Sequence, residues 1–258
     1  MQLHFFKYQG TGNDFILLDN REKNITLSTE QVAFLCNRRF GIGADGLMLL
    51  EKHIDSDFRM VYYNSDGKES SMCGNGGRCI TAFAKRLGLV QHEAKFLAVD
   101  GFHKATIDAN EIVSLQMIDV PEMDLSKDVA ILNTGSPHYV LWVDDVALVD
   151  LQTLGRSIRN EKRFEPGGIN VNFIQMLGNI LKVRTYERGV EDETLSCGTG
   201  VTAAAIASTG DKTGDFTVAV ETPGGNLEVS FSKSQPYAAT KVWLKGPAVF
   251  VYEGDITI

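Results

Sequence analysis

The segment SMCGNGGRC (residues 71–79) places a cysteine directly before a glycine-rich run, and a related segment, LSCGTGVTA, occupies residues 195–203. Apolar or small residues follow the glycines in both segments, at helical spacing in the first (Ile80, Phe83, Ala84), so each cysteine is predicted to lie at the start of a helix. A helix N-terminus exposes backbone N–H groups and the positive end of the helix dipole, which lowers the pKa of a nearby thiol and attracts anions. Glycines let a bound anion approach the backbone closely. Each segment therefore predicts a reactive thiol beside a site for a carboxylate.

The two segments belong to a repeat that runs through the chain. Thr11-Gly12 recurs as Thr134-Gly135, 123 positions later, and the Cys-Gly-x-Gly pattern recurs after 124 positions. Several such matches in the same order indicate two copies of one fold. We therefore expect an N-terminal half over residues 1–119 and a C-terminal half over residues 120–246, with a last strand at 247–258 that returns to the first half.

The elements predicted around the two segments favour an α+β fold. A helix is expected after each cysteine, at about 76–88 and 200–209, and the second is apolar or small on nearly all sides, which indicates a helix enclosed by other elements. Hairpin-length connections between the strand-like runs favour antiparallel sheet. We expect two pseudosymmetric domains, each with an antiparallel β-barrel-like sheet wrapped around a central α-helix. Strands are expected at 3–8, 15–20, 47–53, 58–64, 94–99, 102–108, 112–118, 139–143, 169–177 and 179–187, and two further helices at 28–39 and 151–163.

Composition and charge limit the class of partner. The chain has 258 residues, of which 43% are hydrophobic and 22% charged, and its 25 basic and 33 acidic residues give a formal charge of −8. This acidic balance argues against nucleic acid or an anionic membrane as the main partner. The sequence shows no N-terminal signal pattern and no apolar run of the roughly 18 residues that a membrane span needs. With four cysteines and no signal, we expect a cytoplasmic protein with reduced thiols.

Two cysteines in equivalent repeat positions suggest a pair that acts on one carbon atom. If both helix starts face one substrate, one thiolate can remove an α-proton from one side of an amino acid while the other thiol protonates the opposite side. A thiolate alone is too weak a base for this step, so preorganised N–H groups would have to stabilise the developing charge. Cys73 and Cys197 are therefore predicted to invert a stereocentre.

Other interpretations of these residues fit less well. Cys36 and Cys79 lie within helical runs, which is typical of buried core cysteines. A zinc site would need closer cysteine spacing or a histidine pair, and a thiol–disulfide enzyme normally carries Cys-x-x-Cys. The segment GIGADG (residues 41–46) matches a dinucleotide-binding pattern, but it follows a predicted helix and precedes a strand-like run, which reverses the required context. We therefore expect no metal site.

The motifs GTGNDF, YYNSDG, MCGNGGRC, GSPH, YERG and CGTG, in this order, resemble those of the diaminopimelate epimerases, and the resemblance covers essentially the whole chain. The fold that it implies has two pseudosymmetric domains, each with a β-barrel-like sheet around a central helix. The activity that it implies is the cofactor-independent interconversion of LL- and meso-diaminopimelate, on the way to lysine and peptidoglycan. The resemblance also implies a homodimer.

The resemblance further assigns roles to individual residues. Cys73 and Cys197 would form the acid–base pair, with Cys197 the base in the LL-to-meso direction. His138 and Glu187 would lie near the thiols and modulate their protonation. The residues implied to bind substrate, by loop amides at the reacting end and by side chains largely at the distal end, are Asn13, Asn64, Gly74, Asn75, Asn170, Glu187, Arg188, Gly198 and Thr199.

Two positions depart from the family pattern. The family often has asparagine where Ser136 precedes Pro-His, and often has glutamine where Gly46 stands, so substrate selectivity is the property most affected. Two alternative functions stay open: a proline-racemase-like or other amino-acid epimerase, and a non-catalytic thiol redox or metabolite-binding protein of the same fold. The proline racemase pattern has histidine where this chain has Asn75, which favours the diaminopimelate assignment.

Overall fold

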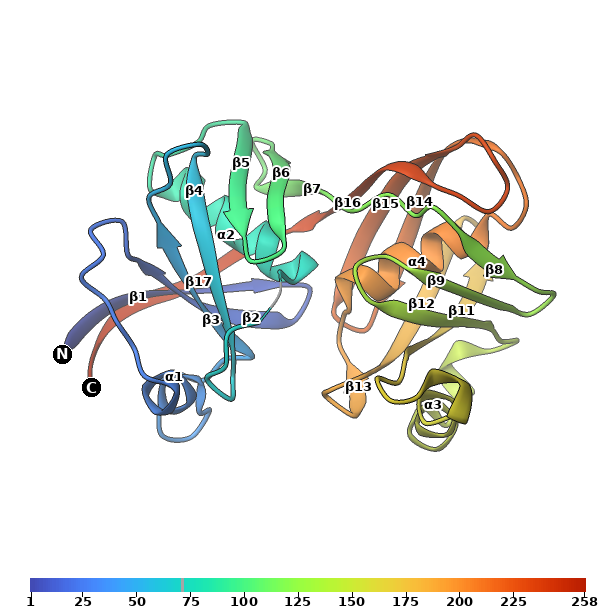
Figure 1. Cartoon of the computed structure of the whole chain (residues 1–258), viewed down its shortest axis with the longest axis horizontal. Helices are drawn as coiled ribbons and strands as arrows, with labels where there is room; N and C mark the ends of the chain where they lie inside the picture. Colours follow the sequence, from blue (N-terminus) through green and yellow to red (C-terminus); the bar gives the residue numbers. More distant parts are fainter. Residues whose placement is uncertain (71) are drawn as a thin grey trace. The chain divides into compact units, whose positions relative to one another are not determined.

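The computed structural model describes residues 1–70 and 72–258, and the chain divides into two compact units (Figure 1). The first unit comprises Met1–Leu115 and Gly246–Ile258, and the second comprises Gln116–Lys245. Each unit consists mainly of strands with a small number of helices, which is the α+β class expected from the sequence.

In the first unit, the helix α2 lies among strands, and the last strand of the chain runs beside the first (Figure 1). α2 (Gly74–Arg86) is buried from its first residue to Ala84 and packs against β1, β2, β3 and β6. The elements of this unit are β1 (Gln2–Gly10), β2 (Asn13–Asp19), α1 (Thr29–Cys36), β3 (Gly46–Glu51), β4 (Phe58–Asn64), α2, β5 (Glu93–Ala98), β6 (Gly101–Ile107), β7 (Ile112–Gln116) and β17 (Val249–Thr257).

In the second unit, the helix α4 takes the place that α2 has in the first. α4 (Gly198–Ser208) packs against strands on several sides, and its alanine-rich sequence lets those strands approach its axis closely. The elements of this unit are β8 (Met123–Leu125), β9 (Val129–Asn133), β10 (Pro137–Trp142), the 3₁₀ helix η1 (Val146–Leu148), α3 (Leu151–Arg159), the 3₁₀ helix η2 (Lys162–Phe164), β11 (Asn170–Leu177), β12 (Ile180–Glu187), β13 (Asp192–Thr194), α4, β14 (Gly214–Thr222), β15 (Gly225–Lys233) and β16 (Thr240–Pro247).

The two units share one order of elements. In each, a connection that carries a helix twice joins two parallel strands: β2–α1–β3 and β4–α2–β5 in the first unit, and β10–α3–β11 and β12–α4–β14 in the second, where the short strand β13 also stands between β12 and α4. These parallel pairs differ from the antiparallel sheets expected from the sequence. They arise because a connection that carries a helix crosses over and returns the chain in the same direction, whereas the short connections give antiparallel pairs such as β14–β15.

Both central helices begin two residues earlier than expected, directly after the cysteines, at Gly74 and Gly198. The sequence hid these starts because glycine is a poor helix former. Ser28 and Gln31 form a capping box at the start of α1. Cys36 and Cys79 are buried, which confirms them as core residues.

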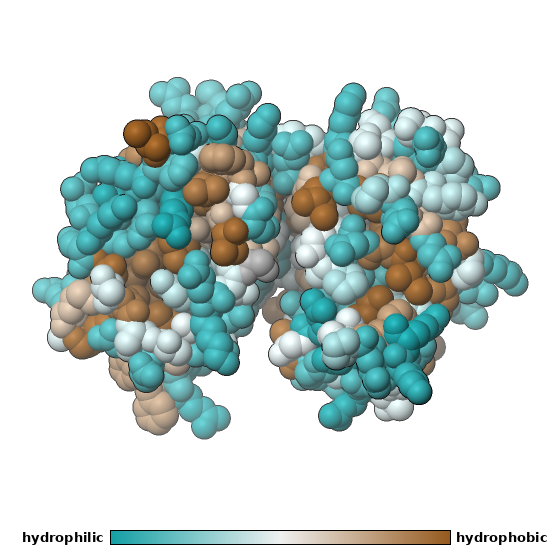
Figure 2. Space-filling view, viewed as in Figure 1, coloured by the Kyte–Doolittle hydropathy of each residue, from teal (hydrophilic) through white to brown (hydrophobic). Residues whose placement is uncertain are grey.

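The large apolar side chains lie mostly inside the two units. Phe58, Phe96 and Phe173 are fully buried, and the first two stack with ring centroids 5.0 Å apart. The face drawn in Figure 2 carries many hydrophilic residues, with apolar residues scattered among them. Within residues 1–70 and 72–258, no helix is long and apolar enough to cross a membrane.

Candidate active site

The two cysteines singled out in the sequence are the N-cap residues of the central helices. Cys73 precedes α2 with extended backbone (φ −102°, ψ 136°), and Cys197 precedes α4 in the same way (φ −106°, ψ 111°). The first intrahelical bonds run from Gly77 N to the Cys73 carbonyl and from Val201 N to the Cys197 carbonyl, both at 2.8 Å. The amides ahead of these belong to the first turn, which an α-helix leaves without intrahelical acceptors. Each helix start therefore presents N–H groups and a positive dipole end next to a sulfur atom.

In the first unit, Cys73 lies beside Asn13 and Asn75. The side-chain oxygen of Asn13 accepts hydrogen bonds from the Cys73 thiol (3.6 Å) and from Asn75 Nδ2 (3.2 Å). Asn13 Nδ2 donates to a carboxylate oxygen of Asp45 (2.7 Å), which fixes the orientation of the amide because a carboxylate only accepts. An oxygen that accepts from sulfur stabilises the protonated thiol, so this surrounding suits a proton donor.

Asn64, another expected substrate residue, ends β4 in an exposed position and pairs in register with Gly46 of β3. Gly46 follows Asp45, the partner of Asn13, so Asn13 and Asn64 lie at neighbouring positions of the same sheet. A Cβ atom on Gly46 would lie 2.5 Å from Cε2 of Tyr62, so the glutamine often present in the family has no room here.

A fully buried guanidinium, that of Arg78, lies in the first turns of α2. Its nitrogen atoms donate to Thr11 Oγ1 (3.2 Å) and to the carbonyl oxygens of Gly74 and Pro247 (both 3.4 Å). Burial lowers the pKa of Arg78, while electrostatic attraction to the thiolate forms of Cys79 and Cys73 raises it. Arg78 was not among the site residues expected from the sequence, although it stands within the cysteine motif.

The neighbouring thiol, Cys79, is a core group. Burial raises the pKa of Cys79 to about 12, and the nearby charge of Arg78 lowers it. Cys79 therefore stays protonated at neutral pH and does not compete with Cys73 as a base.

In the second unit, Cys197 lies at one end of a hydrogen-bonded group of side chains. Its sulfur is 3.4 Å from Thr199 Oγ1, which is 3.0 Å from His138 Nε2. Ser136 Oγ is 2.9 Å from His138 Nε2 and 3.2 Å from Thr199 Oγ1. The main chain of Thr199 is held as well, because its carbonyl accepts from the Thr134 hydroxyl (2.8 Å). Thr199 thus contacts Cys197, and His138 contacts Thr199.

His138 is neutral in this environment. Burial and, to a smaller extent, the positive charge of Arg188 lower the pKa of its imidazole to about 3. An imidazole with such a pKa carries no charge at neutral pH. It can therefore direct hydrogen bonds without competing for the proton of the thiol.

The expected substrate residues of the second unit continue this group. Asn170 Nδ2 donates to Ser136 Oγ (3.1 Å) and to the Pro137 carbonyl (3.2 Å), and its side-chain oxygen accepts from the backbone N–H of Arg188 (2.9 Å). The guanidinium of Arg188 donates to the Gly167 carbonyl at 3.4 Å. Glu187 is the last residue of β12 and precedes Arg188. Cys197, His138, Asn170 and Arg188 are thus linked through a single network of contacts.

Two residues of this network were missed in the sequence. Asn172 is fully buried and contacts both His138 and Thr185. One signal could have found Asn172: it stands two positions after Asn170 in the segment NVN, and side chains two apart lie on the same face of a strand. Thr185 carries no such signal, because its place opposite Asn172 follows from the pairing of β11 with β12.

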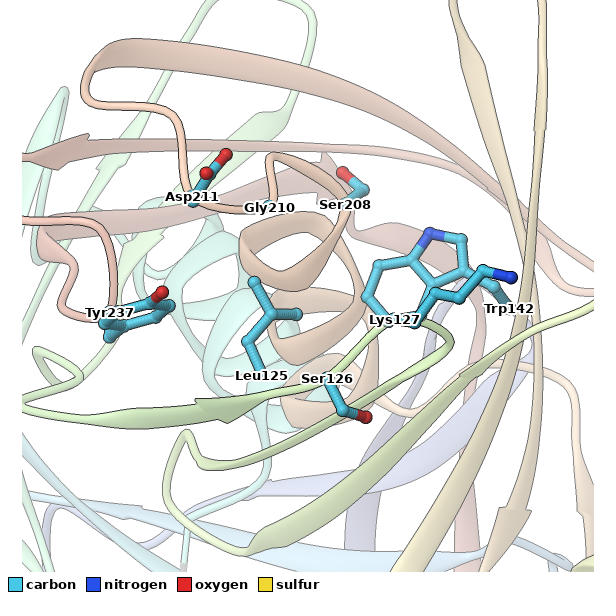
Figure 3. A pocket seen from close by; sticks show the side chains of 8 residues that line it. All are labelled: Leu125, Ser126, Lys127, Trp142, Ser208, Gly210, Asp211 and Tyr237. Carbon is cyan, nitrogen blue, oxygen red and sulfur yellow. The ribbon is translucent and has the colours of Figure 1, made fainter.

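A depression of about 420 Å³ also opens in the second unit, but it lies away from the thiol. Figure 3 shows its side chains near the C-terminal end of α4, where Ser208, Gly210 and Asp211 contribute to the wall. Cys197 stands at the opposite end of this helix, roughly 16 Å away for an 11-residue helix at 1.5 Å per residue. The depression is therefore separate from the candidate active site.

The described part of the chain contains no cluster of side chains suited to bind a metal ion. Among residues 1–70 and 72–258, no three His, Cys, Asp or Glu side chains are grouped so that they could hold a metal ion. The chemistry available at each helix start is that of a thiol, backbone N–H groups and amide side chains.

Known proteins match both the sequence and the fold. A model of the family described as diaminopimelate epimerase matches residues 5–118 and 130–251. The chain belongs to this family. A diaminopimelate epimerase of Flavobacterium psychrophilum is 50% identical over 258 residues, covering 98% of this chain and 100% of the relative. A diaminopimelate epimerase of Chlorobaculum tepidum is 41% identical over 261 residues, covering 96% and 99%.

Solved structures with low sequence identity support the fold alone. A Bacillus anthracis phenazine biosynthesis protein of the PhzF family superposes with a TM-score of 0.77 at 14% identity, over 100% of both chains. A hydroxyproline epimerase from Agrobacterium vitis superposes with a TM-score of 0.71 at 14% identity, over 99% of this chain and 92% of that one. The epimerase-like α+β fold and the family predicted from the motifs are confirmed.

Proposed function

We propose that this isomerase interconverts LL-2,6-diaminopimelate and meso-diaminopimelate, the reaction after which its family and its 50%-identical relative are named. The observation that carries the proposal is the presence of a cysteine at the start of each central helix, within a chain that matches this family over nearly its whole length. The product serves lysine and peptidoglycan synthesis.

In this reaction two thiols act on opposite faces of one α-carbon. In the LL-to-meso direction, the Cys197 thiolate takes the α-proton, and the electron pair of the C–H bond spreads onto the α-carboxylate. The Cys73 thiol then gives its proton to the other face of the carbon. The enzyme ends with a Cys197 thiol and a Cys73 thiolate, which is the state that catalyses the reverse direction. Neither step needs a cofactor.

The helix starts would supply the stabilisation that a thiolate base requires. Backbone amides of Gly74, Asn75, Gly198 and Thr199 would hold the α-carboxylate, where negative charge grows as the proton leaves. One N–H donor of this kind contributes about 10²–10³-fold to the rate in enzymes with an oxyanion hole. The extended backbone at each cysteine, which leaves the first-turn amides beside the sulfur, supports this assignment.

The other expected residues would bind the substrate largely at its distal end, which carries a second ammonium and a second carboxylate. Arg188 can take a carboxylate through two parallel hydrogen bonds. Asn13, Asn64 and Asn170 each offer a donor and an acceptor, and Glu187 offers a negative charge to the ammonium. Ser136, which departs from the family pattern, keeps a hydrogen-bonding role because it contacts His138 and Asn170.

We also infer a homodimer that binds diaminopimelate from the family, and a cytoplasmic location without nucleic-acid or membrane partners from the cysteine content and the acidic charge. Sedimentation equilibrium at micromolar concentration should give a mass of twice the 28.4 kDa of one chain. A single species of 28.4 kDa would remove the dimer from the account.

A substrate panel tests the proposed function. The purified enzyme should epimerise LL-diaminopimelate and leave proline, hydroxyproline and monocarboxylate amino acids unchanged, as measured by chiral chromatography. Comparable turnover of proline would favour a proline-racemase-like function instead. The absence of turnover on every substrate, from a folded and reduced protein, would favour a thiol-based binding or redox role.

A further inference from the structure

The amide of Asn172 determines which nitrogen of His138 carries the ring proton. Asn172 Nδ2 lies 3.3 Å from the carbonyl oxygen of Tyr139 and 3.0 Å from His138 Nδ1. A carbonyl oxygen only accepts, so the atom that faces it has to be the NH₂ group. The same group therefore donates to His138 Nδ1, which is the unprotonated nitrogen. The Thr185 hydroxyl donates to Asn172 Oδ1 (3.0 Å) and holds the amide in this orientation.

The ring proton on Nε2 then points toward the Cys197 end of the network. Nε2 of His138 is 2.9 Å from the Ser136 hydroxyl and 3.0 Å from that of Thr199. The Ser136 oxygen accepts a further hydrogen bond from Asn170 Nδ2 (3.1 Å). A hydroxyl oxygen that accepts a hydrogen bond in this network can still donate its own proton to another acceptor. For Thr199, the sulfur of Cys197 at 3.4 Å lies in reach of that proton.

We propose that the hydrogen bonds from Asn172 through His138 to Thr199 make the Thr199 hydroxyl a fixed donor to the Cys197 sulfur and thereby favour the thiolate form of Cys197. Asn172 and Thr185 act as positioning residues, since neither contacts the sulfur. The catalytic meaning of this thiolate rests on the proposed function, whereas the direction of the hydrogen bonds is a property of the second unit by itself.

At Cys73, the other cysteine, the hydrogen bond to sulfur runs in the opposite direction. Asn13 turns its NH₂ group to the Asp45 carboxylate and its oxygen to the Cys73 thiol, so the sulfur donates there. One sulfur is thus an acceptor and the other a donor. A two-base inversion needs one thiolate and one thiol at the start of each turnover, and the LL-to-meso direction needs the thiolate on Cys197.

Two charged residues, Arg188 and Glu187, stand next to each other beside the network. Burial and the charge of Arg188 hold the pKa of His138 at about 3, so the imidazole stays neutral at neutral pH. Arg188 is also the cation next to Asn170, and Glu187 beside it is the acidic residue at the end of the same strand. The remaining side chains of the network are neutral Ser, Thr and Asn.

The position of the ring proton can be measured directly. In the ¹⁵N NMR spectrum of the full-length enzyme at pH 7, His138 should show the neutral form with hydrogen on Nε2, assigned by its loss in His138→Gln. Asn172→Asp, whose carboxylate only accepts, should move a proton to Nδ1. A wild-type ring with hydrogen on Nδ1, or a ring unchanged in a folded Asn172→Asp protein, would overturn the proposal. If Asn172→Asp does not fold, Thr185→Val gives the same readout, with a mixture of the two forms expected.

The effect on the thiol is measured by alkylation, without any turnover. In a Cys73→Ala background, the rate of Cys197 alkylation by iodoacetamide is followed against pH by peptide mass spectrometry. Thr199→Val should raise the midpoint by about one pH unit, as expected when a hydrogen bond to the charged form is lost. Thr199→Ser should restore it. An unchanged midpoint in Thr199→Val would refute the proposal.

A matched variant separates this effect from general loosening of the helix. Thr202 is a buried threonine on α4 whose hydroxyl donates to the Gly198 carbonyl (2.9 Å), outside the network. Thr202→Val should leave the Cys197 midpoint where it is, and a shift as large as that of Thr199→Val would also count against the proposal. Because alkylation needs no substrate, a negative result here is distinguishable from failure of the proposed epimerase activity in the substrate panel.

Discussion

Gly200 and its repeat equivalent Gly76 should respond in opposite ways to replacement by alanine. A Cβ atom on Gly200 would lie 2.3 Å from Asn172 Oδ1 and 3.3 Å from Cys197 Cβ. A Cβ atom on Gly76 would meet only Met48 Sδ at 3.4 Å and Met60 Cε at 3.5 Å, which are ordinary contacts with flexible side chains. The helix α4 therefore packs directly on Asn172, whereas α2 leaves space for a methyl group.

The magnitudes follow from these distances. The new methyl group in Gly200→Ala is about 1 Å too close to Asn172, and overpacking of this kind costs about 1–3 kcal/mol. In Gly76→Ala the methyl group fits, and replacing a helical glycine stabilises by roughly 0.5–1 kcal/mol. We expect the two variants to differ by about 2–3 kcal/mol in the free energy of unfolding. Urea unfolding followed by circular dichroism measures this difference.

Gly200→Ala should also disturb the network that ends at Cys197. Asn172 has to move away from α4, and its hydrogen bonds to His138 and Thr185 then lengthen. We expect kcat to fall by about tenfold or more, because about 1.4 kcal/mol of lost transition-state stabilisation is a factor of ten. A Gly200→Ala enzyme with wild-type stability and wild-type kcat would refute this view of the packing. So would a Gly76→Ala protein that is destabilised by as much as Gly200→Ala.

Three other variants have defined outcomes. Arg188→Lys keeps the charge but loses the two-point contact with a carboxylate, so KM for diaminopimelate should rise about tenfold or more in steady-state kinetics. An unchanged KM would remove Arg188 from the distal site. The pKa of His138 is about 3 in the folded protein, whereas its ordinary value is 6.5. Below about pH 6.5 the unfolded chain therefore binds a proton that the folded protein does not, so the wild type loses stability as the pH falls toward 3. His138→Asn removes this loss of stability, which is about 1.4 kcal/mol per pH unit. The urea midpoint of the variant should therefore fall less steeply than that of the wild type between pH 7 and 4. Parallel curves would contradict a buried neutral histidine. Arg78→Met removes a buried positive charge that interacts with Cys73, so the midpoint of Cys73 alkylation in a Cys197→Ala background should shift to higher pH. Arg78→Lys should stay closer to the wild type. An Arg78→Met profile identical to that of the wild type would show that Arg78 is only a packing residue.

The motifs of the sequence were sufficient for the family, the fold class and the position of each cysteine at a helix start. Glycine-rich segments and the repeat carry this information locally, so no long-range contact had to be known. The surroundings of Cys197 could not be predicted in the same way. Asn172 reaches His138 because β10 and β11 pair in parallel, with His138 opposite Asn170, and a parallel register across a helical connection leaves no local signal.

Electrostatic properties were also hidden in the sequence. A lone histidine such as His138 usually serves structure, and its neutral state here follows from complete burial and from the charge of Arg188. The buried charge of Arg78 is likewise a property of the packed unit, because nothing in the motif shows that α2 encloses it. Residue identity gave the donors and acceptors, and only the fold gave the direction of each hydrogen bond.

The origin of the hydrogen atom on the inverted carbon tests the central claim, that two thiols act on opposite faces of one stereocentre. LL-diaminopimelate is converted in D₂O, and both the product and the remaining substrate are analysed by mass spectrometry and NMR during the first few per cent of the reaction. Two-base inversion predicts solvent deuterium on the inverted α-carbon of every meso product molecule and almost none in the recovered LL substrate. Product that retains the original hydrogen, or substrate that exchanges as fast as product forms, would contradict the account.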